Sequence, residues 1–281
     1  MTKKGVLYIV ATPIGNLEDI SLRAIGVLQS VDFIAAEDTR HSQKLLAHLG
    51  IKNTLISLHD YNERSQSGEL LEKITQGASL ALISDAGTPL ISDPGYVLVQ
   101  MAHVQGIRVV PIPGACALIA ALSASGLPTD RFVFEGFLPE KPNARRKALE
   151  HLKLETRTLI FYEAPHRILE SLRALVEILG GEREATLARE LTKTFETIRF
   201  GTLAELLGWV ENDVNQTRGE IVLLVKGAKA PDKTELTAES LHILKILMTE
   251  LSLKDAVGLT AKMTGIQKQL LYKSGLDLSK S

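Results

Sequence analysis

Cysteine, aromatic residues and net charge are all scarce in this chain of 281 residues. The single cysteine, Cys116, excludes an intrachain disulfide and is typical of a reducing compartment. Aromatic residues make up 5% of the sequence, which argues against a surface built on base stacking. The 32 Lys and Arg residues nearly balance the 33 Asp and Glu residues, so the net charge is −1. Without a global positive field, any RNA site must be a local basic patch.

Long apolar runs are also missing, since none approaches the roughly 20 residues that span a bilayer. Lys3 and Lys4 precede an apolar run at 6–11 in the manner of a secretory signal, but the run is short and Pro13 ends it. We interpret 6–11 as a first strand. The composition predicts a cytoplasmic α/β enzyme without a membrane partner.

Several catalytic and binding motifs are absent. Residues 11–16, ATPIGN, match neither G-x-G-x-x-G nor G-x-x-x-x-G-K-[ST], which argues against dinucleotide redox and nucleoside triphosphate chemistry. The seven histidines are scattered and the chain has no H-E-x-x-H or C-x-x-C, so we expect no metal site. No residue that could act as a catalytic base lies at a spacing from Cys116 that would suggest a nucleophile–base pair. We therefore interpret Cys116 as a small residue that faces a cleft.

Five apolar runs alternate with helical patterns in the first half of the chain. The expected strands are 6–11, 31–36, 54–58, 80–83 and 107–112. The expected helices are 17–30, 43–49, 67–76, 96–104 and 115–124. This alternation predicts a mostly parallel sheet covered by helices on both faces.

The pattern changes after residue 127. Further strands are expected at 132–137, 158–162, 186–191, 195–200 and 220–225. The third and fourth of these lie on either side of Lys193, close enough for a hairpin, so the second sheet should be mixed. We therefore predict a two-domain α/β fold, with domains at 1–127 and 128–228.

A helical tail at 236–281 is predicted after a Lys- and Pro-bearing linker at 229–233. Its expected helices are 236–251, 254–264 and 266–275, and Gly265 between the last two suits a helix-turn-helix. The tail is either an accessory that contacts nucleic acid through its lysines or a cap that packs on protein.

Polar or glycine-bearing turns follow four of the first-half strands, at 12–16, 37–41, 59–63 and 85–89. A single such turn is usually structural, and Asp85 suits a turn cap as well as a ligand contact. Four turns on the same edge of one sheet favour a ligand cleft, because the carboxyl ends of parallel strands lie together.

Charged segments also follow strands of the second half. The segment 163–167 contains His166 and Arg167, which suit a phosphate or ribose contact, although a helix-capping turn is the alternative. The cations that would form either a local basic face or an ordinary solvated surface are Arg40, Arg145, Arg146, Arg167, Arg189 and Lys193.

At these motifs the chain resembles the tetrapyrrole-methylase superfamily of S-adenosylmethionine-dependent methyltransferases, over roughly residues 5–228. Residues 10–16 lie where these enzymes carry V-G-A-G-P-G-D, and they keep Gly15 in register. Residues 86–89 lie where the superfamily carries G-G-D-P, and 110–117 are similar to its V-x-P-G-x-[ST]-[SA] turn. The match continues in order through 161–163, 199–206 and 219–225.

The resemblance is to the ribosomal RNA branch of the superfamily. The segments that mark this branch are 11–16, 36–40, 57–60, 84–94 and 163–167, and residues 254–272 are similar to its helix-turn-helix. Membership implies S-adenosyl-L-methionine as cofactor, bound in a cleft between two domains, and a homodimer. It also implies methyl transfer to the ribose 2′-oxygen of a decoding-centre cytidine in the 16S ribosomal RNA of the small ribosomal subunit, with no DNA as partner.

This resemblance and the turns together define the expected site. The cofactor-binding residues are expected to be Pro13, Ile14, Gly15, Asp85, Ala86, Gly87, Thr88, Cys116, Ala117, Glu163 and Glu220. The substrate-binding residues are expected to be Arg40, His166, Arg167, Arg189 and Lys193. A base or a cation near the ribose oxygen would help to remove its proton. The unranked candidates for this catalytic role are Glu37, Asp38, His59, Asp85 and Lys193.

Two other functions are open on the sequence. The same fold could methylate a tetrapyrrole or another small molecule, although the cations and the extra tail argue against this. The second alternative is a helix-turn-helix regulator that senses S-adenosylmethionine. The nearly neutral net charge and the modestly basic tail argue against this function.

Overall fold

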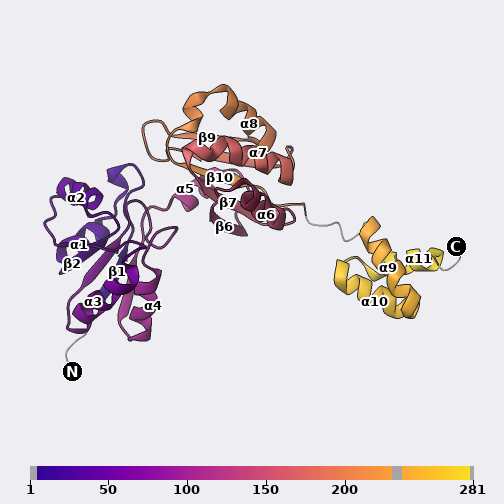
Figure 1. The fold of residues 1–281 in the computed structure, drawn as a ribbon, viewed down its shortest axis with the longest axis horizontal. Coiled ribbons are helices and arrows are strands. Elements are labelled where there is room, and N and C mark those ends of the chain that lie inside the picture. The colour runs from indigo at the N-terminus through magenta and orange to yellow at the C-terminus, as the bar shows by residue number, and fades with distance from the viewer. Residues whose placement is uncertain (1–4, 230–235, 279–281) are drawn as a thin grey trace. The chain divides into compact units, whose positions relative to one another are not determined.

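The computed structural model describes residues 5–229 and 236–278, which belong to two compact units, 1–228 and 229–281. The first unit contains two five-stranded sheets, and the second contains three helices (Figure 1). In the described ranges, no helix combines the length and the apolar character that crossing a membrane requires. The predicted linker 229–233 lies, apart from its first residue, outside the described residues.

The first sheet is entirely parallel, with the strand order β3-β2-β4-β1-β5. Its strands are β1 Val6–Val10, β2 Phe33–Ala36, β3 Leu55–Ser57, β4 Leu80–Ile83 and β5 Arg108–Ile112. Every residue of the central strand β4 is buried, as expected for a strand with helices on both sides. The predicted parallel sheet is therefore confirmed.

Side chains of β4 point alternately into two hydrophobic cores. Leu80 and Leu82 pack with α3 Glu63–Thr75 and α4 Tyr96–Val104, whereas Ala81 and Ile83 pack with α1 Leu22–Ser30 and α2 Thr39–His48. The helix that follows β5, α5 Ala117–Ala124, does not join either core. Its Leu118 and Leu122 pack instead against the second sheet.

The second sheet is mixed, with the order β6-β7-β10-β8-β9. Its strands are β6 Phe132–Phe137, β7 Thr158–Glu163, β8 Glu184–Arg189, β9 Thr197–Thr202 and β10 Ile221–Val225. Strands β6 and β7 are parallel, and the other neighbours are antiparallel, including the predicted β8–β9 hairpin.

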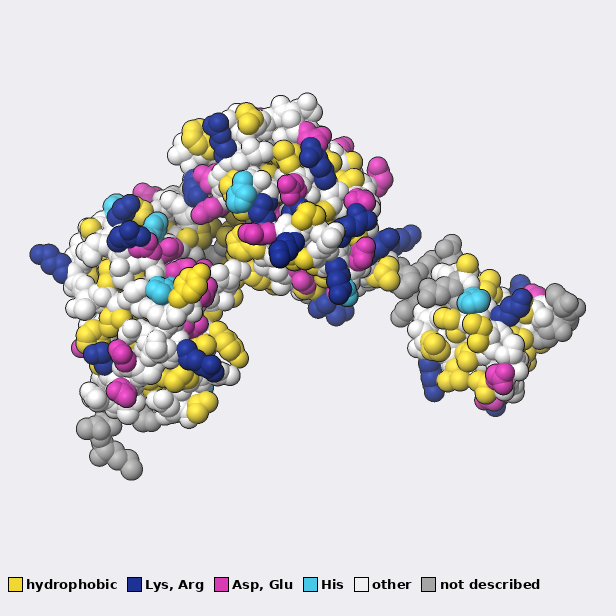
Figure 2. All heavy atoms as spheres, in the orientation of Figure 1, with side chains coloured by type: hydrophobic (Ala, Val, Ile, Leu, Met, Phe, Trp, Pro, Cys, Tyr) yellow, Lys and Arg dark blue, Asp and Glu magenta, His cyan; other side chains and the backbone are white. Residues whose placement is uncertain are grey.

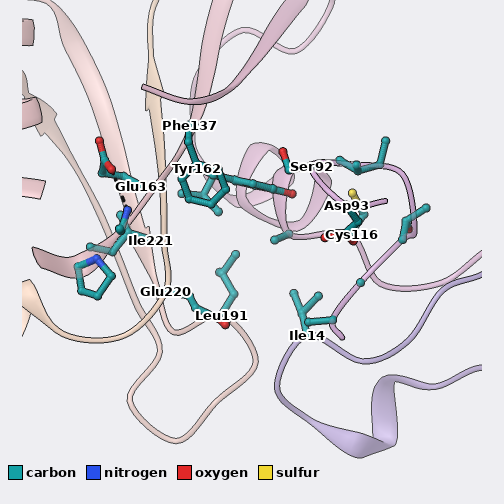
Figure 3. Close-up of a pocket in the computed structure, with 18 residues that line it drawn as sticks. Ile14, Ser92, Asp93, Cys116, Phe137, Tyr162, Glu163, Leu191, Glu220 and Ile221 are labelled. Atoms are coloured by element: carbon teal, nitrogen blue, oxygen red, sulfur yellow. Dashed lines mark hydrogen bonds between the residues drawn. The ribbon is translucent and has the colours of Figure 1, made fainter. Parts of the chain in front are cut away.

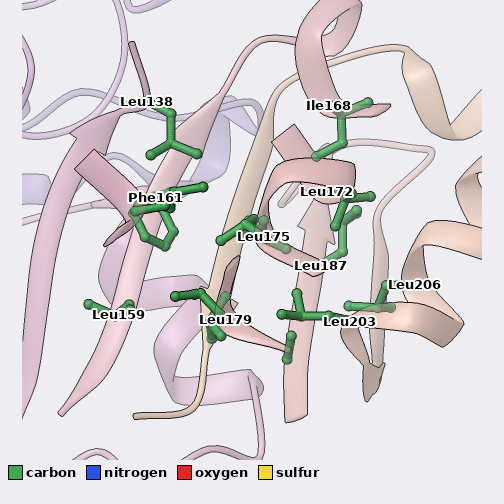
Figure 4. Close-up of a cluster of buried hydrophobic side chains, with 14 of the residues drawn as sticks. Leu138, Leu159, Phe161, Ile168, Leu172, Leu175, Leu179, Leu187, Leu203 and Leu206 are labelled. Atoms are coloured by element: carbon green, nitrogen blue, oxygen red, sulfur yellow. The ribbon is translucent and has the colours of Figure 1, made fainter. Parts of the chain in front are cut away.

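Opposite faces of this second sheet are covered by different helices. Helices α6 Pro142–Leu152, α7 Ile168–Leu179 and α8 Leu203–Asn212 pack on one face, around Phe161 and Leu187 (Figure 4). Helix α5 packs on the other face, against Ile160 and Leu224. The predicted domain boundary at residue 127 therefore falls just after a helix that packs on the second sheet.

Capping residues move two helix boundaries from their predicted places. The predicted helix 17–30 is divided into a 3₁₀ turn, η1 Leu17–Asp19, and α1, because Ser21 Oγ caps the backbone N–H of Ala24. Helix α2 begins at Thr39 rather than at 43, because the Asp38 carboxylate accepts the backbone N–H groups of the first turn. Two further 3₁₀ turns are η2 Pro165–Arg167 and η3 Val214–Thr217.

The second unit consists of α9 Ala238–Glu250, α10 Leu253–Thr264 and α11 Lys268–Leu278. Its buried side chains form a core of their own, which includes Leu244, Val257 and Leu271. Helix α10 ends at Thr264 and is capped by Gly265, whose φ of 74° is the left-handed conformation that favours glycine after a helix. Three helices were expected here, and their order and approximate bounds agree with the prediction.

Candidate functional site

Two adjoining cavities lie where turns of the first sheet meet the second sheet. The first, which we call the apolar cavity, has a volume of ≈ 360 Å³. It is lined by Ile14, Ala86, Gly87, Thr88, Ile91, Ser92, Asp93, Cys116, Ala117, Phe137, Tyr162, Glu163, Ala164, Pro165, Leu191, Glu220, Ile221 and Val222. Figure 3 shows side chains around it from turns that follow strands of the first sheet, such as Ile14 and Cys116, and from the second sheet, such as Tyr162 and Ile221.

The turns after β1, β4 and β5 are bound to one another at this cavity. Thr12 and Gly87 exchange backbone hydrogen bonds of 2.8 and 3.1 Å, and Thr88 Oγ1 donates to the Ala115 carbonyl at 3.0 Å. Gly87 has a φ of +84°, and a Cβ atom there would lie 3.2 Å from Ile14 Cγ2. A glycine at this position therefore lets the backbone line the cavity closely.

Aromatic rings of the second sheet form the opposite wall. Tyr162 packs edge to face with Phe137 and Phe134, at centroid distances of 5.7 and 4.8 Å. The Tyr162 hydroxyl accepts the backbone N–H of Leu118 at 3.3 Å, and burial raises the pKa of this phenol above its usual range. The wall is thus apolar, rigid and suited to a flat ligand group.

Glu163 lies behind this wall, and its carboxylate accepts hydrogen bonds from neighbouring protein groups. Its carboxylate accepts the backbone N–H of Ala164 at 2.8 Å and a hydrogen bond from the buried Ser171 hydroxyl. Arg167 Nε lies 3.5 Å from the same carboxylate, and its guanidinium donates to the Leu138 carbonyl. The contacts of Glu163 and Arg167 therefore stabilise the turn that forms this edge of the cavity.

The second cavity, which we call the polar cavity, has a volume of ≈ 390 Å³. It is lined by Pro13, Ile14, Gly15, Leu17, His41, Ser42, Lys44, Leu45, Ser84, Asp85, Ala86, Lys193 and Glu220. Three of these residues, Ile14, Ala86 and Glu220, also line the apolar cavity. The two cavities therefore share a wall.

Lys193 lies on the β8–β9 hairpin at this shared wall. Its Nζ lies 2.8 Å from Glu190 Oε1 and 3.0 Å from Glu220 Oε2. Gly15 packs against the same hairpin so closely that a Cβ atom there would lie 2.4 Å from Lys193 Cγ. The hairpin residues Glu190 and Thr192 have φ values of 52° and 64°, a backbone conformation that is strained for residues other than glycine.

Carboxylates converge beside the polar cavity. Burial, together with the nearby charges of Asp93, Asp85 and Asp60, raises the pKa of Glu37 to about 7. Burial also raises the pKa of Asp93, to about 6. Asp85 Oδ1 accepts the backbone N–H of Asp38 at 3.1 Å, which fixes its orientation. Among the described residues, no group of His, Cys, Asp and Glu has a geometry that could hold a metal ion.

Several predicted site residues do not line either cavity. Asp38 caps α2 and pairs with Arg40 at 3.1 Å, and the hydrogen bond from Arg40 lowers the pKa of Asp38 to about 2. Arg40 is mostly exposed, His166 is exposed on η2, and the His59 ring packs edge-on against Tyr61. These positions give Asp38 a structural role.

Arg189 is buried inside the second sheet and its guanidinium is surrounded by protein acceptors. It donates to Gln216 Oε1 at 3.1 Å and to the carbonyls of Arg218 and Phe195 at 3.3 and 3.2 Å. In this structure the Arg189 guanidinium therefore holds the β8–β9 hairpin.

Two of the cations that could form either a basic face or a solvated surface are held in ion pairs. Arg145 pairs with Glu170 at 2.7 Å, and Arg146 pairs with Glu177 at 2.6 Å. On the face shown in Figure 2, Lys and Arg side chains are interspersed with Asp and Glu side chains across the first unit. The local cations at the site are instead those of the polar cavity.

Sequence reasoning missed two groups of lining residues. His41, Ser42 and Lys44 come together on α2 because this helix begins four residues earlier than predicted, so that its first turns face the polar cavity. Asp38 at a capping position was the signal that could have located this start. Phe137 and Tyr162 form the apolar wall through long-range packing, which no local pattern indicates.

Known proteins resemble this chain over nearly its full length. A ribosomal RNA small subunit methyltransferase I of Pseudomonas aeruginosa is 58% identical over 274 residues, which cover 97% of each chain. A protein of the same name from Escherichia coli O157:H7 is 55% identical over 274 residues, covering 98% of this chain and 96% of its own length. Residues 234–279 match the RsmI C-terminal HTH domain.

Solved structures share the fold of the first unit. Uroporphyrin-III-C-methyltransferase from Thermus thermophilus aligns with a TM-score of 0.57 at 22% identity, covering 79% of this chain and 94% of its own. The methyltransferase CobJ aligns with a TM-score of 0.60 at 18% identity, covering 83% and 97%. Residues 6–207 match the family described as Tetrapyrrole (Corrin/Porphyrin) Methylases. The chain belongs to this family of S-adenosyl-L-methionine-dependent methyltransferases.

Proposed function

We propose that this protein methylates the 16S RNA of the small ribosomal subunit, at the ribose 2′-oxygen of a decoding-centre cytidine. The names of relatives more than 50% identical over the whole chain support ribosomal RNA as substrate. The structural observation that carries the proposal is the shared wall of Ile14, Ala86 and Glu220, because methyl transfer needs donor and acceptor side by side. Such an enzyme would act in the cytoplasm, without DNA or membrane partners.

The apolar cavity fits S-adenosylmethionine. Its volume of ≈ 360 Å³ lies within the range of about 300–1,000 Å³ that is usual for small-ligand pockets. The apolar side chains of Tyr162, Leu191 and Val222 suit a purine ring, and the carboxylate of Asp93 complements a positively charged ligand. The backbone of the turns at 86–88 and 116–117 would hold the polar groups of the cofactor.

When bound, the cofactor supplies an electrophilic methyl group on a sulfonium. The protein then has to hold the ribose hydroxyl in place and accept its proton. We assign proton acceptance to Asp85, because it lines the polar cavity and directly precedes Ala86 of the shared wall. The backbone N–H of Asp38 fixes the Asp85 carboxylate, so little reorganisation is needed when the hydroxyl approaches.

Labelled S-adenosylmethionine tests the activity directly. The protein is incubated with small ribosomal subunits from cells that lack this enzyme, with a porphyrin precursor, or with neither. We expect label only in the 16S RNA, in a dinucleotide that resists alkaline hydrolysis because its 2′-oxygen is methylated. Label confined to the porphyrin fraction, or a methylated base, would reject the proposal.

We also propose that the protein is a homodimer through the open edge of its second sheet. Strand β9 is the last strand of that sheet. Its Phe200 and the hairpin residue Phe195 are 53% and 72% exposed, which is unusual for phenylalanine on a monomer surface. Light scattering should give a dimer mass for the wild type and a monomer mass for a Phe195→Ser/Phe200→Ser variant. A monomeric wild type would reject this arrangement.

A further inference from the structure

We propose that the polar cavity binds the ribose and the adjoining phosphate of the target nucleotide, with His41, Ser42 and Lys44 of α2 as its contacts. The inference rests on the proposed function and identifies where the RNA substrate enters the first unit. It replaces the arginines expected from the sequence, since Arg167 and Arg189 are occupied by protein groups.

The polar cavity lies next to the apolar cavity. A methyl acceptor has to lie about 3 Å from the methyl carbon, so it must bind next to the cofactor. The polar cavity adjoins the proposed cofactor cavity, because Ile14, Ala86 and Glu220 line both. Its volume of ≈ 390 Å³ is large enough for part of a nucleotide.

Ser42 gives an independent indication of a polar ligand. The residue is only 2% exposed and lines the cavity. Its Oγ is buried and has no hydrogen-bond partner in the part of the chain that the structure describes. Buried hydroxyls are nearly always paired, so a bound group that hydrogen-bonds to Ser42 would complete this site.

Charge indicates which ligand groups face which wall. Lys44 lies on α2, and within the described ranges it has no acidic partner at ion-pair distance, whereas Lys193 is already paired with two carboxylates. Lys44 and the neighbouring His41 therefore suit a phosphate. Asp85, which also lines the cavity, suits a ribose hydroxyl, because its carboxylate would accept a hydrogen bond from that hydroxyl.

Lys44→Ala tests the assignment, with Lys44→Arg as the conservative variant. Lys52→Ala is the matched control, because Lys52 is an exposed lysine just beyond α2 and outside both cavities. For each variant, KM and kcat are measured for methylation of small ribosomal subunits at several salt concentrations, and the Kd for S-adenosylmethionine is measured by calorimetry.

We expect Lys44→Ala to raise KM for the subunits about tenfold and to lower the slope of log KM against log salt by about 1. The Kd for S-adenosylmethionine should stay within about twofold of wild type, and Lys44→Arg should restore most of the KM. Lys52→Ala should resemble wild type in both measurements. An unchanged KM in Lys44→Ala would overturn the proposal.

Ser42→Ala separates a ligand contact from a structural role. Removing an unpaired buried hydroxyl should leave the melting temperature unchanged or higher, while KM for the subunits rises. A lower melting temperature with unchanged KM would make Ser42 structural and contradict the assignment. A parallel loss of cofactor affinity in Lys44→Ala would place part of the cofactor in this cavity and also contradict it. If wild type labels no subunits at all, the proposed function itself fails, and the nucleotide site with it.

Discussion

The backbone N–H of Asn16 donates to Thr192 Oγ1 at 3.1 Å, and this bond joins the turn after β1 to the β8–β9 hairpin. The two residues are 176 positions apart in the sequence. Beside this bond, Gly15 touches the hairpin backbone, and Lys193 bridges to Glu220. The two sheets therefore meet at the wall that both cavities share.

Gly15→Ala should disturb this contact. A Cβ atom at Gly15 would lie 2.4 Å from Lys193 Cγ and 3.1 Å from the Leu191 carbonyl oxygen, so the hairpin would have to move. We expect a loss of about 1–3 kcal/mol in unfolding free energy, as for other overpacked sites, and at least tenfold weaker cofactor binding. Denaturant titration and calorimetry measure the two effects.

Gly26→Ala is the control for this change, because a Cβ atom at Gly26 in α1 would meet no heavy atom within 4 Å. Alanine within a helix should stabilise the protein by about 0.5–1 kcal/mol and leave cofactor binding unchanged. If both variants bind the cofactor like wild type, the close approach of Gly15 to the hairpin does not shape the site.

Asp85→Asn should remove the proton acceptor while keeping the size of the side chain. We expect kcat for subunit methylation to fall by about 100-fold or more, with Kd for the cofactor within a few fold of wild type. Asp38→Asn is the comparison, since asparagine is also a good helix cap and should keep α2 intact. A larger kcat loss in Asp38→Asn than in Asp85→Asn would reverse the assignment.

The pKa of Glu37, raised to about 7 from an ordinary 4.5, makes stability depend on pH. Because the folded-state pKa is raised, the stabilisation from protonated Glu37 is complete below about pH 4.5 and is lost as pH rises through 7. Glu37→Gln should therefore gain stability over wild type as pH rises, by about 1–2 kcal/mol at pH 8 after allowing for solvent screening.

Thermal unfolding of Glu37→Gln and wild type at pH 5 and pH 8 tests this dependence. Glu72→Gln, an exposed change on α3, should show the same difference from wild type at both pH values. A Glu37→Gln variant whose advantage does not grow with pH would show that this carboxyl titrates normally in the folded protein.

Arg189→Met should destabilise the protein rather than weaken RNA binding specifically. The guanidinium is buried and bonded to Gln216, Arg218 and Phe195, and its loss would leave these acceptors unpaired, at a cost of about 2–4 kcal/mol. Arg173→Met removes an exposed pair with Glu211 and should cost less than about 1 kcal/mol. A stable Arg189→Met protein with weakened RNA affinity would restore the role expected from the sequence.

A chain that ends after Lys229 should keep its cofactor site and lose most of its activity on ribosomal subunits. The hydrogen bond from the Ala228 N–H to the Glu155 carbonyl, at 2.6 Å near the end of the first unit, would be retained. The second unit has its own core and a cavity of ≈ 850 Å³ whose lining includes Lys254, Lys262 and Lys268. We expect cofactor Kd within twofold of wild type and at least tenfold less subunit methylation.

In the full chain, Lys262→Glu should weaken subunit binding more than Lys245→Glu, an exposed change on α9 outside that cavity. Aggregation of the shortened chain, or loss of its cofactor affinity, would instead show that the tail supports the first unit.

Local sequence patterns were sufficient for both sheets. The buried apolar run of β4 is recognisable within a few residues, and with the other strands it predicted the parallel first sheet. The short turn around Lys193 in the same way predicted the β8–β9 hairpin. Turn residues at strand ends also located much of the cavity lining, including Ile14, Ala86 and Thr88.

Long-range packing decided what the patterns could not. The sequence around Arg189 does not indicate that its guanidinium would donate a hydrogen bond to Gln216. The sequence around Phe137 likewise does not indicate that its ring would line a cavity. Asp38 was assigned as a catalytic candidate because a carboxylate after a strand resembles a site residue, although it also suits a helix cap. The late predicted start of α2 then hid Ser42 and Lys44, although the predicted turn at 37–41 included His41.

Helix α5 follows a strand of the first sheet in the sequence, but it packs against the second sheet. Leu118, Ala121 and Leu122 close the face formed by Ile160, Val222 and Leu224, while β5 directly before the helix pairs with β1. A fragment that stopped at the end of α5 would carry an uncovered apolar helix, and a fragment that began at β6 would expose the matching apolar strands. Each fragment would expose the apolar surface that the other fragment covers. We therefore expect the two fragments to fold when they are combined and reassemble, and neither to fold stably alone.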